Sequence, residues 1–189
     1  MFKFIKKQNI KKRGFSLVET LVALFVFSIA ITATMAVMSQ GITNINSAKK
    51  KVTASFLAQE GIEYVRNMRD TSVIDYSEYE PIDVWDLFYS RITPCAQGSL
   101  CYLDENVVNT TQEAAQFCDG AGICPDLLFN EGFYGYNNNG VNSGFKRIIS
   151  VDDSGYLNGY IKVNSIVEWK ENGITKSVTF SEYLTNWVE

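Results

Sequence analysis

The first pattern in the chain is an unbroken apolar run from Phe15 to Met38. These 24 residues contain no glycine, proline, lysine or arginine, and Glu19 carries their single formal charge. At about 1.5 Å per residue, a helix of this length reaches roughly 36 Å, which is more than the hydrocarbon thickness of about 30 Å. The run therefore predicts a membrane-spanning helix over residues 15–38.

The charges on the two sides of this run are unequal. Residues 1–14 hold six of the 17 basic residues and none of the 21 acidic ones, and the next cation is Lys49. This bias predicts a single pass through the cytoplasmic membrane, with the N-terminus inside and the C-terminus outside. A secretory signal peptide has a shorter apolar core that ends at a small-residue site, whereas here the small residue, Gly14, precedes the run. We therefore expect the apolar segment to be retained.

Residues 39–70 continue the helical pattern with a different character. Gly41–Asn46 is rich in weak helix formers, which predicts a bend or local melting at this point. Beyond Lys49, apolar or small residues recur at helical spacing and predict an amphipathic helix to about Asp70. Its apolar stripe, which we expect to pack against a domain rather than to hold a cofactor, comprises Ala54, Leu57, Ala58, Ile62, Val65 and Met68.

Residues 71–189 are expected to form a globular head outside the membrane. From Thr71 to Gly144, prolines, glycines and a run of asparagines interrupt the pattern, so only short elements are expected. The segment from Asp83 to Arg91 is compatible with either a short helix or a strand.

The last 45 residues contain three β-rich runs, which are Phe145–Val151, Tyr160–Lys170 and Ile174–Leu184. Between the last two runs, Asn172-Gly173 predicts a two-residue hairpin turn. That turn pairs Val167 with Val178, and it also pairs Trp169 with Lys176 and Ser165 with Phe180. Val167, Val178, Trp169 and Phe180 then share the face that covers the helix stripe. The predicted fold is α+β, a long N-terminal helix, transmembrane in one half and amphipathic in the other, packed on a C-terminal antiparallel sheet.

Composition narrows the function classes. The 189 residues are 46% apolar and 20% charged, which suits one modest globular domain. Histidine is absent, which excludes Ser-His-Asp and Cys-His catalysis, and no phosphate-loop motif is present, so we expect neither an enzyme nor a cofactor. From Phe15 onward, 11 basic residues face 21 acidic ones, and this balance of −10 argues against nucleic-acid binding.

The boundary between the basic leader and the apolar run carries a motif. From Lys12 to Glu19 the sequence reads Lys-Arg-Gly-Phe-Ser-Leu-Val-Glu. A basic leader, a glycine, an aromatic residue, three more residues, a glutamate and an apolar helix form the pattern of a prepilin peptidase site. Over residues 9–40 the chain resembles the type IV pilins and type II secretion pseudopilins, and it is most similar to a minor type IV pilin.

The resemblance implies roles for three residues. A prepilin peptidase would remove residues 1–14 by cutting between Gly14 and Phe15, Phe15 would be N-methylated, and Glu19 would act in assembly. The implied partners are other pilin subunits in a filament, a pilus assembly platform and the inner membrane. The implied architecture is a long N-terminal helix, half in lipid and half in the head.

Glu19 also has a physical interpretation of its own. A carboxylate on a lipid-facing helix costs free energy, so it favours a charged partner. Cleavage after Gly14 creates an amine at Phe15, and the same amine on a neighbouring subunit is a candidate for that partner. The alternative is a carboxylate at the headgroup level that only marks the end of the helix.

The four cysteines lie in the part predicted to be outside the membrane, where thiols oxidise. They form two pairs with five residues between the members, Cys95 with Cys101 and Cys118 with Cys124. We expect disulfides, and local pairing would staple two loops, although the sequence leaves all three connectivities open. Free thiols are one alternative. A four-cysteine zinc site is another, but its ligand pairs usually have about two to four residues between them.

A calcium site in the glycine-containing loops is a further alternative. Asp119, Asp126 and Glu131 supply carboxylates there, and some pseudopilins bind calcium in such loops. The spacing fits no EF-hand, and a polar surface loop is the simpler interpretation. We therefore expect no metal site.

Together these observations predict a structural subunit. It would be a minor pilin or pseudopilin of a type IV pilus-like filament, resident first in the cytoplasmic membrane and then in an extracellular or periplasmic filament. The alternatives are a membrane-anchored or pilus-tip module for binding and adhesion, and a minor pseudopilin of a type II secretion system.

Overall fold

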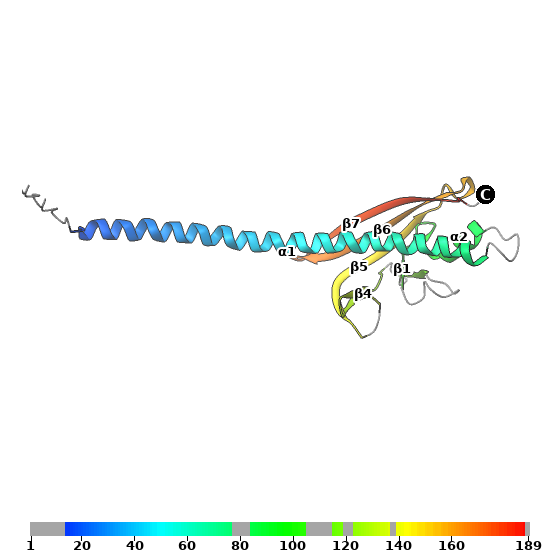
Figure 1. Cartoon of the computed structure of the whole chain (residues 1–189), viewed down its shortest axis with the longest axis horizontal. Helices are drawn as coiled ribbons and strands as arrows, with labels where there is room; N and C mark the ends of the chain where they lie inside the picture. The colour runs from blue at the N-terminus through cyan, green and yellow to red at the C-terminus, as the bar shows by residue number, and fades with distance from the viewer. Residues whose placement is uncertain (1–13, 77–83, 105–114, 119–122, 137–138, 188–189) are drawn as a thin grey trace, which may run out of the picture. The chain divides into compact units, whose positions relative to one another are not determined.

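The computed structural model describes residues 14–76, 84–104, 115–118, 123–136 and 139–187. They belong to two compact units, Met1–Asn46 and Ser47–Glu189. Helix α1, Leu17–Tyr76, contributes residues to both units (Figure 1).

The first unit consists, in its described part, of the helical residues that precede Ser47. Nearly all of its side chains are exposed, and its most apolar 18 residues have a mean hydropathy of 2.4 with none of them buried. Within the described part of the chain, α1 is the one helix long and apolar enough to cross a membrane. Its hydroxyl groups donate to carbonyl oxygens three residues earlier, as in Thr20 to Leu17, Ser28 to Phe25 and Thr34 to Ile31. An apolar surface whose polar groups are satisfied within the helix is compatible with lipid.

The stretch Gly41–Asn46 is α-helical throughout, so the predicted local melting is wrong. Helix propensity is a weak preference, and the regular turns on both sides of the stretch outweigh it. The helix also ends later than expected, at Tyr76 rather than near Asp70. Tertiary contacts hold this last turn, because buried Ser72 donates to the Met68 carbonyl and accepts a hydrogen bond from Arg91.

Among its described residues, the second unit contains a seven-stranded sheet in which every pairing is antiparallel. A meander of three long strands forms its main part, which comprises β5 (Val141–Asp152), β6 (Tyr160–Glu171) and β7 (Ile174–Thr185). The other edge of β5 pairs with two shorter strands, β1 (Cys101–Leu103) near Ile149 and β3 (Asp126–Asn130) over Val141–Lys146. Beyond them lie β2 (Ala115–Phe117) against β1 and β4 (Phe133–Gly135) against β3.

The β6–β7 hairpin confirms the predicted register. Val167 pairs with Val178, and the same ladder joins Trp169 to Lys176 and Ser165 to Phe180. Asn172 and Gly173 have φ of 51° and 79°, the two positive values that a two-residue hairpin turn of this hand requires. Because the turn sets the register, it also decides which side chains of β7 face α1.

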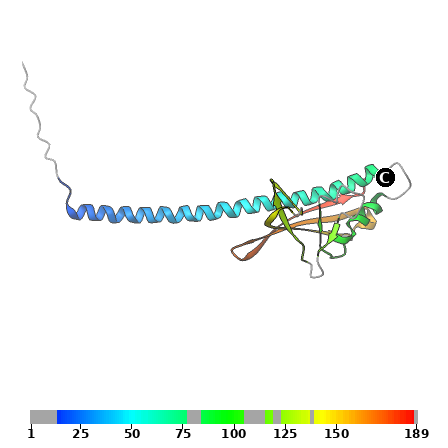
Figure 2. The same cartoon turned by 90° about the horizontal axis from the view of Figure 1, so that it is seen from below.

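The predicted helix stripe is buried against one face of the sheet. All six of its members are buried, and Figure 2 shows β6 and β7 running alongside this part of α1. Ala54, Leu57 and Ala58 pack in one cluster with Val167 and Trp169. The later part of the stripe packs in a second cluster with residues of β5, β6 and the short helix α2, and this cluster includes Ile62, Val65, Met68, Ile149 and Val163. The α+β prediction is therefore confirmed.

The segment left open between helix and strand is helical. Helix α2 spans Val84–Ile92 and is followed by a 3-10 turn, η1 (Thr93–Cys95). Its buried residues are Trp85, Phe88 and Ile92. Their spacing of three and four residues places all three side chains on one face of a helix, which packs on the core, whereas a strand would not place them on one face. A second 3-10 turn, η2 (Tyr156–Asn158), joins β5 to β6.

Candidate processing and assembly site

The predicted scissile bond lies in a short non-helical segment. Gly14, Phe15 and Ser16 precede α1, and the Thr20 amide donates to the Ser16 carbonyl oxygen at 3.2 Å as the helix begins. Phe15 is 79% exposed, and a Cβ atom added to Gly14 would meet no atom within 4 Å. The described structure therefore leaves space for a side chain at position 14, so a requirement for glycine there would come from a partner that handles this segment.

Glu19 lies in the first turn of α1, four residues after Phe15. An acidic residue in this turn is favoured by the positive end of the helix dipole. It is the single charged residue among residues 14–46, and it forms no ion pair with any residue that the structure describes. Its side chain is exposed on an otherwise apolar helix. A partner for this carboxylate would therefore have to come from outside the residues that the structure describes.

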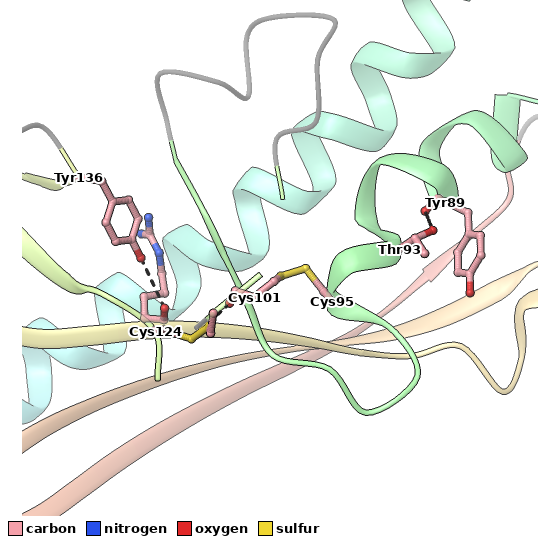
Figure 3. The surroundings of a disulfide bond; sticks show 8 residues. Tyr89, Thr93, Cys95, Cys101, Cys124 and Tyr136 are labelled. Carbon is pink, nitrogen blue, oxygen red and sulfur yellow. Dashed lines mark hydrogen bonds between the residues drawn. A yellow bond between two sulfur atoms is a disulfide. The ribbon is translucent and has the colours of Figure 1, made fainter. Parts of the chain in front are cut away.

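The four cysteines form two disulfides, and each cysteine is paired with its near neighbour in sequence. This is the local pairing among the three possible connectivities. Cys95–Cys101 joins the end of η1 to the start of β1 (Figure 3), and Cys118–Cys124 closes the loop between β2 and β3. The second bridge packs with Ile148 and Ile166 on the face of the sheet opposite α1. The first bridge thus links β1 to η1, and the second links the end of β2 to the start of β3. With all four sulfurs paired, none remains as a thiolate ligand for zinc.

The calcium alternative does not assemble in the described part of the head. Asp119 lies outside the described residues. Asp126 is the first residue of β3 and Glu131 follows its last residue, so roughly 16 Å of extended chain separates them. Asp126 accepts a hydrogen bond from the Asn142 amide instead. No group of three metal-ligating side chains occurs among the residues described.

The sequence interpretation missed a buried polar network between α1 and β5. Arg147 is fully buried, and its Nη1 donates to Glu60 Oε2 at 2.8 Å. The Tyr64 hydroxyl donates to the other oxygen, Oε1, at 3.1 Å, and the guanidinium carbon lies 4.9 Å from the Tyr64 ring centroid. The alternation of β5 carries the signal that was overlooked. Phe145 and Ile149 face α1, so Arg147 between them must face it too.

Comparison with known proteins identifies the N-terminal segment. Residues 9–35 match the prokaryotic N-terminal methylation motif. This segment is a prepilin-type signal. The signal, which is that of type IV pilins and pseudopilins, includes Gly14, Phe15 and Glu19 and ends within the apolar part of α1. No curated protein and no solved structure matches the chain.

The prepilin-type signal supports a type IV pilin-like or pseudopilin subunit, a structural class rather than an enzymatic one. It implies processing by a prepilin peptidase and assembly with other pilin subunits. Together with the apolar helix that follows, it indicates membrane anchoring.

Proposed function

We propose that the protein is a minor pilin or pseudopilin that is cut after Gly14, methylated on Phe15 and packed by α1 into a type IV pilus-like filament. The observation that carries this proposal is the prepilin-type signal directly before an exposed apolar helix. The continuity of α1 supports it as well, because the same helix that anchors the precursor reaches the core of the head.

Processing requires access to one peptide bond. Hydrolysis adds water across the Gly14–Phe15 bond and leaves a carboxylate on Gly14 and an amine on Phe15. The bond precedes the first helical residue, Leu17, so cleavage would not have to unwind α1. The basic leader would hold the bond at the cytoplasmic face, where the positive-inside bias places residues 1–14.

Assembly follows from the charges that processing leaves. The new amine of Phe15 and the carboxylate of Glu19 are the only charges that the mature chain carries before Lys49. In an apolar filament core, each would be costly alone, and pairing between the amine of one subunit and Glu19 of its neighbour would satisfy both. Such a contact joins two different surfaces of neighbouring subunits. Interfaces of this heterologous type build open helical filaments when the rotation between subunits does not close a ring.

The head is suited to the outer side of the membrane. All four cysteines lie in the head and are paired, as is typical of an oxidising compartment. A filament of this kind exposes the head outside the membrane while α1 forms the core, so the head would be extracellular or periplasmic after assembly on the pilus assembly platform.

Mass spectrometry of the mature N-terminus tests the proposal. We expect the assembled protein to begin at methylated Phe15, and we expect Gly14→Val to block cleavage. Gly41→Val is the matched control, because a Cβ added at Gly41 would also meet no atom within 4 Å. An N-terminus at residue 1 in assembled material, or absence of the wild-type chain from sheared filaments, would contradict the proposal.

A further inference from the structure

The second unit, Ser47–Glu189, contains an apolar groove between α1 and the β3–β4 hairpin. Its volume is about 430 Å³, and it is lined by Thr53, Phe56, Leu57, Glu60, Gly132, Phe133 and Tyr134. We call this feature the Phe56–Phe133 groove. It lies within the second unit, and it is separate from Gly14, Phe15 and Glu19.

Two large aromatic side chains border the groove without being buried. Phe56 is 67% exposed and Phe133 is 80% exposed. Phe56 comes two positions after Ala54, which faces the sheet, so it points to the other side of α1. Exposed phenylalanines on both walls of one cavity mark a surface that gains free energy when a partner covers it.

The hairpin wall of the groove is held in place by the core. Its turn uses Glu131 and Gly132, which have φ of 48° and 96°. Tyr134 packs edge-on against Phe145, with 6.0 Å between ring centroids, and joins the cluster beneath the early part of α1. Because Tyr134 is anchored, its neighbour Phe133 is presented to solvent at a fixed place. The groove is therefore formed before any partner arrives.

The charge of the groove is already neutralised. Glu60 is the one charged side chain among the described lining residues. Its two carboxylate oxygens accept hydrogen bonds from Arg147 and Tyr64. A cationic partner would have to compete with a buried arginine for this carboxylate. An apolar partner would not, so the chemistry of the groove favours an apolar occupant.

We propose that the Phe56–Phe133 groove receives the apolar N-terminal part of α1 from a neighbouring subunit of the filament. This inference rests on the proposed function. One wall of the groove is α1 itself, and exposed apolar residues recur along this helix at helical spacing in Ile42, Ile45, Val52 and Phe56. The partner surface has matching chemistry, since residues 15–46 expose many bulky apolar side chains and no cation. An apolar helix laid in an apolar groove is a common mode of recognition.

Site-specific photocrosslinking tests this contact in the full-length chain in cells. A benzophenone derivative of phenylalanine is placed at position 133 or, as the control, at position 157. Leu157 is 94% exposed and lies in η2, which follows the opposite end of β5 from the one that pairs with β3. We expect the position 133 probe in sheared filaments to give adducts with residues 15–46 of a pilin-type subunit, and the position 157 probe to give none. Adducts with lipid, with a soluble protein or with another head surface would overturn the proposal.

Substitution gives the second arm of the test. Phe133→Ser and Phe56→Ser are expected to lower the filament-to-membrane ratio of the chain about tenfold, whereas Leu157→Ser should leave the ratio unchanged. Both phenylalanines are exposed, so the variants should fold and should keep both disulfides, which thiol counting checks. If the wild-type chain enters filaments but Phe133→Ser enters them equally well, the groove proposal alone is wrong. If the wild-type chain is absent from filaments, both proposals are wrong.

Discussion

Gly61 of α1 lies directly against Ser165 of β6. A Cβ atom added at Gly61 would overlap Ser165 Oγ, and it would lie 3.0 Å from Arg147 Cδ and 3.2 Å from Ile149 Cδ1. The helix can approach the sheet this closely only because position 61 has no side chain. Ser165 Oγ is buried and has no hydrogen-bond partner among the described residues. Its burial therefore costs free energy that no hydrogen bond offsets.

Gly61→Ala should therefore destabilise the head although alanine is the better helix former. We expect a loss of about 1–3 kcal/mol in the free energy of unfolding, because overpacking outweighs the propensity gain of about 1 kcal/mol. The measurement is urea unfolding of the full-length chain in detergent, followed by the fluorescence of its three tryptophans, which all lie in the head. Gly41→Ala, which has open space at its Cβ position, should be neutral or stabilising. The loss should shrink in a Ser165→Ala background, and equal losses in both backgrounds would contradict the assigned clash.

Loss of Glu60 should leave a buried cation without its carboxylate. Arg147 Nε and Nη2 have no hydrogen-bond partner in the described structure, so Glu60 supplies the carboxylate that this guanidinium pairs with, beside the ring of Tyr64. We expect Glu60→Ala to lower the free energy of unfolding by about 3 kcal/mol, and Arg147→Met to lower it less, because methionine removes the charge together with its need for a partner. Denaturant titration of both variants checks the order. A larger loss for Arg147→Met would show that packing of the arginine stem matters more than its charge.

The disulfides should form on export and should add stability. Each bridge joins cysteines six positions apart, and closing a loop of that size contributes about 2 kcal/mol in the chain-entropy account. We expect the Cys118→Ser, Cys124→Ser double variant to lose about this amount. Alkylation of denatured, unreduced protein from the cell surface should label no cysteine. Four labelled cysteines would remove the staples and restore the free-thiol and zinc alternatives.

The stability of the β6–β7 hairpin should depend on pH through Glu171. The Lys176 ammonium, which lies 2.5 Å from the Glu171 carboxylate, lowers the pKa of that carboxyl, and the Ser47 hydroxyl at 3.2 Å lowers it further. A carboxylate with a lowered pKa contributes stability above the unfolded-state pKa, ordinarily about 4.5, and loses that contribution as the pH falls through the folded value. Glu171→Gln should therefore be less stable than wild type at pH 7, with the difference shrinking toward pH 3. Lys176→Met should weaken this pH dependence without abolishing it, because the Ser47 hydroxyl still donates to Glu171. Urea midpoints between pH 7 and pH 3 measure both effects.

Replacement of Glu19 should impair assembly after insertion. Glu19→Ala is expected to insert, because removal of a carboxylate eases entry into lipid. In the filament core it would leave the Phe15 amine of a neighbour unpaired, and breaking such a buried pair costs on the order of 3 to 5 kcal/mol, which lowers incorporation by a factor of hundreds or more. Glu19→Gln should fail nearly as badly, since an amide cannot neutralise an ammonium group. The amount of each variant in sheared filaments, relative to its membrane pool, measures the effect. Equal ratios for wild type, Ala and Gln would show that Glu19 only marks the end of the helix.

The proposal for the candidate processing site rests on a linear motif, which the sequence displays by itself. Gly14, Phe15 and Glu19 lie at fixed spacing beside an apolar run, and the side chains of Phe15 and Glu19 are exposed in the described structure. Their proposed chemistry depends on partners outside the chain. The Phe56–Phe133 groove is the opposite case, since its two walls are far apart in sequence and neither wall signals the other.

The sequence alone determined the helix stripe and the β6–β7 hairpin. Both depend on local physics, namely the 3.6-residue period of a helix and the positive φ values that Asn172 and Gly173 adopt readily. Only the tertiary structure decided that α2 is a helix and that each cysteine pairs with its near neighbour. It also decided that β1 and β3 pair with the same edge of β5, and that Arg147 is buried where Gly61 of α1 approaches the sheet. These features arise from contacts between residues distant in the sequence. Such contacts can override local preference, because burial against α1 or β5 contributes more free energy than the small differences in propensity between one local structure and another.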